Sequence, residues 1–107
     1  MADNSFQDRV VRMVSEIPIG KVSTYGHIAR AAGIASGARM VGWILNSLSG
    51  DPDIPCHRVV NRNGELTGKV HFPTADFMQE MLLSEGVEFK DERVILDKYL
   101  YIPDSKI

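Results

Sequence analysis

The chain has 107 residues, a net charge of −2, and 44% hydrophobic and 24% charged residues, as in ordinary globular proteins. This length predicts one domain with a single modest core. The single cysteine excludes a disulfide framework, and the sequence has no apolar run of about 18 residues that could span a membrane. The first residues lack the basic and apolar regions of a signal peptide, so we expect a cytoplasmic protein.

Charge is distributed unevenly along the chain. Residues 20–69 carry six Lys and Arg against three Asp and Glu, whereas residues 70–107 carry four against eight. The net charge of −2 argues mildly against nucleic acid as a partner. A cationic central segment nevertheless permits a local anion-binding surface.

The spacing of apolar residues predicts a first helix over residues 5–17, with Ser5 as its cap. Two short helices are expected next, over about 24–32 and about 36–48, and Gly33 separates them. Two helices joined by a tight turn that contains glycine are the signature of a helix-turn-helix. Small helical bundles contain such pairs too, so this pattern alone does not identify a DNA-binding unit.

The second of these short helices carries a distinctive surface. Arg39, Trp43 and Asn46 are spaced so that they share a face away from the apolar stripe. An arginine, an aromatic ring and an amide together suit a nucleic-acid surface. The alternative is that Trp43 is half-buried and Arg39 is merely solvated.

The second half of the chain predicts less regular structure. A short strand is expected over 58–60, a turn over 61–64, a long loop over 65–73, a helix over 74–85 and a terminal hairpin within 87–96. The expected fold class is therefore mainly α with a small β component.

Cys56 is followed directly by His57, and this pair is the strongest chemical signal in the sequence. A free thiol has a pKa of about 8.5, so a nucleophilic cysteine needs a base to take its proton. Glu85 falls on the apolar face of its predicted helix, where a carboxylate needs a partner, and His57 or Arg58 could supply it. Pairing with His57 would make a nucleophile, a base and an orienting group. Otherwise Glu85 sits at a frayed helix end in water.

Four segments resemble the O6-alkylguanine-DNA alkyltransferase family, whose members are methylated-DNA–protein-cysteine methyltransferases. They are residues 54–60 (IPCHRVV), 21–29 (KVSTYGHIA), 38–42 (ARMVG) and 82–86 (LLSEG). The resemblance implies that residues 1–107 form the family's winged helix-turn-helix-like DNA-binding domain, without its separate N-terminal domain. The helix-turn-helix would span about 24–48, and the active-site motif would be 55–59.

The resemblance also implies a mechanism. The recognition helix would enter the minor groove of double-stranded DNA, Tyr25 would press on a phosphate, and Arg39 would replace a flipped O6-alkylguanine in the base stack. Cys56 would accept the alkyl group, His57 would deprotonate it through a water, and Glu85 would hold the imidazole. The thioether is stable, so the protein would act once, as a monomer and without metal or cofactor.

Two sets of binding residues accompany this mechanism. The expected DNA contacts are Ser23, Thr24, Tyr25, Arg39, Trp43 and Asn46. The expected substrate pocket consists of Tyr25, Pro55, Val59 and Thr67. Backbone carbonyls of Cys56 and Val59 would read the guanine amino group.

Several positions depart from the repair enzymes. Leu48 replaces an asparagine, and residues 66–71 replace a Tyr-Ser-Gly-Gly segment, where Thr67 could stand in for the serine. The short chain and its 48–53 loop are more similar to alkyltransferase-like proteins, which bind and flip the lesion without repairing it. Those proteins typically carry tryptophan at the position of Cys56.

Three hypotheses therefore stand. The first is a single-turnover alkyltransferase, and the second is a lesion sensor with an inert Cys56 that flags damage for other repair proteins. The third is a helix-turn-helix transcription regulator, which would read the major groove, usually as a dimer. A lowered thiol pKa favours the first hypothesis over the second, and a raised one favours the second.

Overall fold

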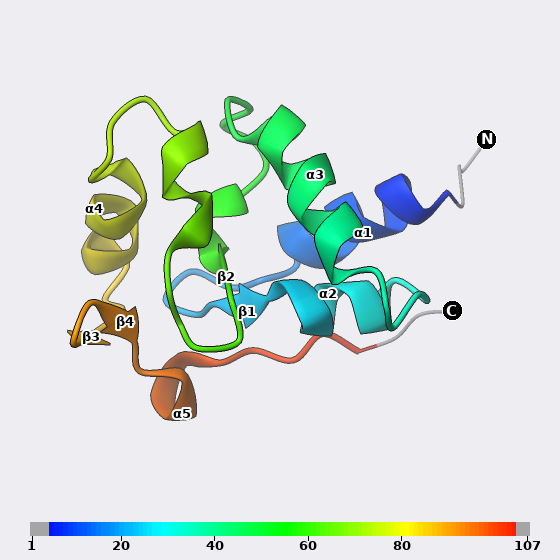
Figure 1. The fold of residues 1–107 in the computed structure, drawn as a ribbon. Coiled ribbons are helices and arrows are strands. Elements are labelled where there is room, and N and C mark those ends of the chain that lie inside the picture. The colour runs from blue at the N-terminus through cyan, green and yellow to red at the C-terminus, as the bar shows by residue number, and fades with distance from the viewer. Residues whose placement is uncertain (1–4, 105–107) are drawn as a thin grey trace.

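The computed structural model describes residues 5–104 (Figure 1). The first helix, α1 (Phe6–Ser15), begins where Ser5 Oγ accepts a hydrogen bond from the Asp8 backbone N–H at 3.1 Å. That cap satisfies one of the free N–H groups of the first turn. The predicted first helix is confirmed, although it ends two residues earlier. Its apolar stripe is buried through Val10, Met13 and Val14.

The predicted helix-turn-helix is formed by α2 (Tyr25–Ala31) and α3 (Ala38–Leu48), which pack against each other. Gly33 has φ of +102°, and the Ile34 N–H donates back to the Ala29 carbonyl at 3.0 Å. This left-handed cap ends α2 and turns the chain toward α3, and glycine adopts it without strain.

Two very short strands join the helix-turn-helix to the Cys-His motif. Strand β1 (Ser23–Thr24) pairs in parallel with β2 (Val59–Val60). Strand β2 directly follows the 3-10 turn η1 (Cys56–Arg58), which contains the Cys-His motif. Arg58 was predicted to begin the strand but lies in the turn instead. Because Tyr25 follows β1 at once, the pairing places the start of α2 beside the Cys-His motif.

The predicted loop over 65–73 contains a short 3-10 helix, η2 (Thr67–His71), none of whose residues is buried. Helix α4 (Phe77–Ser84) follows and begins three residues later than predicted from Thr74. The Phe77 N–H donates to the Thr74 carbonyl at 3.3 Å, so this segment forms a turn before the helix proper.

The predicted terminal hairpin is confirmed as the antiparallel pair β3 (Phe89–Lys90) and β4 (Arg93–Val94). The sequence did not predict the final short helix, α5 (Leu96–Tyr99). The fold class is confirmed as mainly α with a small β component and a helix-turn-helix. Within residues 5–104, no helix is both long enough and apolar enough to cross a membrane.

The core has two parts that meet at the Cys-His motif. One lies among α1, α2 and α3 and includes Cys56 and Val59, and the other lies beneath α4 and includes Val60, Met78 and Leu82. Phe72 packs against both parts. The motif is therefore anchored where the two parts of the core meet.

Candidate active site and nucleic-acid interface

Glu85 is the C-terminal cap residue of α4, directly after Ser84, and Gly86 turns the chain away from the helix axis. Gly86 has φ of +88°, and the Val87 N–H donates to the Leu82 carbonyl at 3.0 Å, which makes the same kind of cap that ends α2. The Glu85 side chain is only 10% exposed. The inward orientation expected from helical spacing is therefore present.

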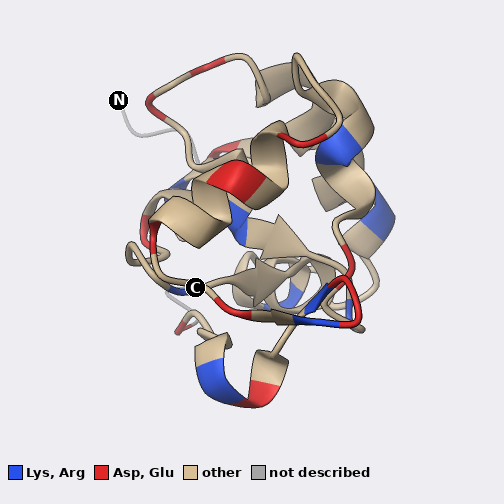
Figure 2. Ribbon diagram, turned by 90° about the vertical axis from the view of Figure 1, so that its left-hand side faces the viewer, with Lys and Arg blue, Asp and Glu red and all other residues tan. Residues whose placement is uncertain are grey.

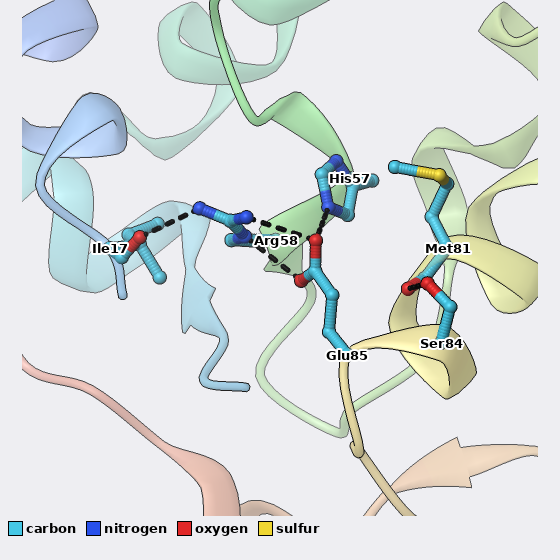
Figure 3. Close-up of polar contacts among 6 residues, drawn as sticks. All are labelled: Ile17, His57, Arg58, Met81, Ser84 and Glu85. Carbon is cyan, nitrogen blue, oxygen red and sulfur yellow. Dashed lines mark hydrogen bonds and ion pairs between the residues drawn. The ribbon is translucent and has the colours of Figure 1, made fainter. Parts of the chain in front are cut away.

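Both expected partners of Glu85 reach it (Figure 3). His57 Nε2 lies 2.8 Å from Glu85 Oε2, while Arg58 donates from Nε to Oε1 at 3.0 Å and from Nη2 to Oε2 at 2.9 Å. Arg58 also donates from Nη1 to the Ile17 carbonyl at 3.0 Å. One arginine thus ties the carboxylate to the chain segment that follows α1.

The electrostatics of this cluster define the histidine tautomer. Burial raises the pKa of Glu85, but the hydrogen bonds and charges of Arg58 and His57 outweigh burial and lower the pKa overall. An ionised carboxylate facing His57 Nε2 requires that Nε2 carry a proton. Nδ1 is then left as an acceptor that can take a proton.

Cys56 begins the 3-10 turn and is 6% exposed. Burial raises its thiol pKa to about 11, the Asp51 charge adds to this rise, and a backbone hydrogen bond offsets only part of it. The thiol is therefore protonated at neutral pH in the free protein. This is the direction that the sequence analysis assigned to an inert cysteine.

A cavity of about 390 Å³ opens between α3 and η2, and we call it the DNA-side cavity. Its lining brings together five predicted binding residues, namely Tyr25, Arg39, Trp43, Asn46 and Thr67. Trp43 is 64% exposed, which is inconsistent with the half-buried alternative.

Tyr25 lies where the DNA-side cavity narrows toward Cys56. Burial raises its pKa, and a hydrogen bond with Thr67 partly offsets the rise, so the phenol keeps its proton and can donate. A Cβ at Gly68 would lie 3.1 Å from the Tyr25 hydroxyl, so η2 packs closely over this ring.

A hollow of only about 10 Å³ adjoins Cys56, and we call it the thiol pocket. It shares Tyr25, Asn46, Gly68 and His71 with the DNA-side cavity. A base cannot fit this volume, so η2 closes the route to the thiol. The sequence analysis missed Gly68 and His71, since the only hint was the atypical composition of the 65–73 loop.

The sequence model of the family described as "6-O-methylguanine DNA methyltransferase, DNA binding domain" matches residues 5–87. The chain belongs to this family. The alkyltransferase-like protein 1 of Schizosaccharomyces pombe is 35% identical over 96% of this chain and all of its own length. The crystal structure of that protein with DNA containing O6-carboxymethylguanine gives a TM-score of 0.81.

Other members of the O6-methylguanine DNA methyltransferase family match over shorter spans. The "DNA base-flipping protein" of Escherichia coli is 44% identical over 79% of this chain, which covers 64% of that protein. The Mycobacterium tuberculosis O6-methylguanine methyltransferase is 32% identical with a TM-score of 0.66, over 78% of this chain and 50% of that one. Alkylguanine repair is thus the setting of the family, and its members include both methyltransferases and alkyltransferase-like proteins.

Four residues predicted from the resemblance to this family lie away from the DNA-side cavity. Ser23 and Thr24 are 0% and 4% exposed and do not line the DNA-side cavity, and Thr24 Oγ1 caps α2 by accepting the His27 N–H. Val59 in β2 is buried, because its side chain packs in the core among α1, α2 and α3. Pro55 lines a different cavity, described below. Within residues 5–104, no cluster of His, Cys, Asp and Glu could hold a metal ion.

Proposed function

We propose that this protein binds double-stranded DNA through α3, flips an O6-alkylguanine toward the thiol pocket, and transfers the alkyl group to Cys56. One observation carries the proposal. The DNA-side cavity, which Tyr25 and Arg39 line, shares four lining residues with the thiol pocket of the only cysteine, whose neighbour His57 is already oriented by Glu85. We expect the protein to act as a monomer in the cytoplasm.

In the proposed reaction, the bond from O6 to the alkyl carbon breaks as the bond from Cys56 Sγ to that carbon forms. The thiol proton passes to His57 Nδ1, and guanine takes up one proton as it is restored. The proton count does not change overall. Glu85 acts by keeping the proton on Nε2, so that Nδ1 stays available.

A second candidate function is recognition of the lesion without transfer. The raised thiol pKa supports it, as does the full-length match to an alkyltransferase-like protein. In that case the bound protein would mark the lesion for other repair proteins. The helix-turn-helix was the reason to consider a transcription regulator, and membership of the family accounts for that motif without one.

The two candidates differ in one measurable product. We would incubate the protein with a duplex containing one O6-methylguanine and record the intact protein mass. Alkyl transfer predicts a single gain of one methylene, absent in Cys56→Ser, while both proteins bind the duplex equally. Tight binding by the wild-type protein with no gain in mass would reject transfer and leave recognition alone.

A further inference from the structure

A second large cavity, of about 470 Å³, lies between the 49–55 loop and α4, and we call it the distal cavity. It shares Ser49 and Phe72 with the thiol pocket, which in turn shares four residues with the DNA-side cavity. The three hollows therefore form a row. The row starts at the proposed DNA surface, passes Cys56 and ends at a separate opening.

The geometry of alkyl transfer indicates which part of a substrate could occupy this row of hollows. In the in-line displacement the carbon bonded to O6 would face Cys56 Sγ, so the rest of any substituent longer than methyl would leave this axis at roughly a right angle and pass beside the thiol. The thiol pocket is far too small to contain it. The distal cavity is of the size that protein sites for small molecules usually have.

The walls of the distal cavity are mainly apolar. They include Ile54, Met81 and two stacked rings, Phe72 and Phe77, whose centroids are 5.3 Å apart. Such walls favour the carbon chain of a substituent. Phe72 also lines the thiol pocket, so it separates the two hollows.

Two aspartates give the distal cavity a net negative charge. Arg58 and Glu85 also line it, but they neutralise each other, and His57 is bonded to Glu85. Asp51 and Asp53 are exposed, and neither forms an ion pair with any residue between 5 and 104. Asp51 Oδ1 accepts the Asp53 N–H at 2.9 Å, which holds the two together. Figure 2 shows acidic positions spread over the loops and the helix of the face turned toward the viewer.

We infer that the distal cavity receives the far end of a long O6 substituent, and that Asp51 and Asp53 favour substituents ending in an amine over those ending in a carboxylate. This inference rests on the proposed function, because only a flipped base would deliver a substituent to the row. Entry requires Phe72 to move and the bond from Ser49 Oγ to the His71 carbonyl, 2.9 Å long, to open.

The test measures equilibrium binding by fluorescence anisotropy in the Cys56→Ser background, where no transfer can occur. Four duplexes differ at one guanine, which is unmodified or carries O6-methyl, O6-aminobutyl or O6-carboxypropyl. We expect the aminobutyl duplex to bind about tenfold more tightly than the carboxypropyl duplex, since each exposed aspartate contributes modestly. Added salt should weaken this preference.

Variants identify the source of the preference. The double substitution Asp51→Asn with Asp53→Asn removes both charges but leaves a side-chain oxygen at residue 51 that can accept the residue 53 N–H, and it should reduce the preference to less than about threefold. Asp97→Asn, on exposed α5, is the matched control and should leave it unchanged.

Two results would overturn the inference. Equal affinity for the two charged adducts, or a preference that survives the double substitution, would show that the aspartates do not face the substituent. The O6-methylguanine duplex distinguishes failure of this inference alone from failure of the proposed function. If it binds no better than unmodified DNA, the proposed function fails and the inference fails with it.

Discussion

The cluster around Glu85 and the short helix η2 both lie near Cys56 and are held very differently. His57 and Arg58 fix the carboxylate through three polar contacts, and Arg58 adds a fourth to Ile17. In contrast, η2 has no buried residue, and Val70 within it is 73% exposed. The proposed catalytic groups are thus rigidly placed, while the element that closes the route to the thiol is weakly held.

This difference explains how a protonated, buried thiol can sit beside an oriented base. In the free protein η2 keeps Cys56 out of water, and burial raises the thiol pKa. Displacing η2 would separate Gly68 from Tyr25 and open the bond from Ser49 to the His71 carbonyl, whereas the hydrogen bonds of the Glu85 cluster involve no residue of η2. We therefore expect the thiol of the free protein to react slowly, and DNA binding to supply the missing access.

The strength of the Glu85 cluster can be tested with Arg58→Met. Removing the guanidinium leaves a largely buried carboxylate with only His57, so the free energy of unfolding should fall by about 3 kcal/mol, more than a hundredfold in the folding constant. Urea unfolding measures this change. Arg93→Met is the control, because its pair with Glu65 spans 3.9 Å with both side chains about half exposed. Equal losses in the two variants would show that the cluster is not rigidly held.

The reactivity of Cys56 tests whether η2 keeps the thiol buried. A thiol pKa of about 11 leaves roughly three hundredfold less thiolate at neutral pH than a free cysteine with a pKa of about 8.5 has. The rate of modification by iodoacetamide should therefore rise with pH without levelling off below about pH 10. A plateau near pH 8 would mean that the thiol is neither buried nor shielded as described.

Arg39→Ala tests the DNA surface. The exposed arginine lines the DNA-side cavity, so its loss should weaken binding to alkylated and plain duplexes together, by about tenfold. Anisotropy titrations with the two duplexes measure both affinities. If the variant binds both duplexes as well as the wild-type protein does, Arg39 has no such role.

The smallest expected effect comes from loosening the close packing of η2 against the Tyr25 hydroxyl. Gly68→Ala places a methyl group 3.1 Å from the tyrosine hydroxyl, so η2 should shift outward and the iodoacetamide rate of Cys56 should rise about threefold. Gly26→Ala is the control, because its methyl group would meet no atom within 4 Å. A rate equal to that of the control would show that η2 does not limit access.

The sequence predicted those features that depend on local pattern. Helical spacing and glycine caps were enough for α1, the helix-turn-helix and the inward position of Glu85 with its two partners. The burial of Ser23 and Thr24 was not predictable, because it depends on pairing with a strand 36 residues later along the chain. The short helices η2 and α5 have too few residues to show a periodic pattern.

We propose that Glu85 orients His57 to activate Cys56. The single-turnover rate of methyl transfer from an O6-methylguanine duplex, followed by intact mass, would be compared between the wild-type protein and Glu85→Gln. We expect a rate at least about tenfold lower in the variant, with DNA affinity changed by less than about twofold. Equal rates in the two proteins, or no transfer by the wild-type protein, would contradict it.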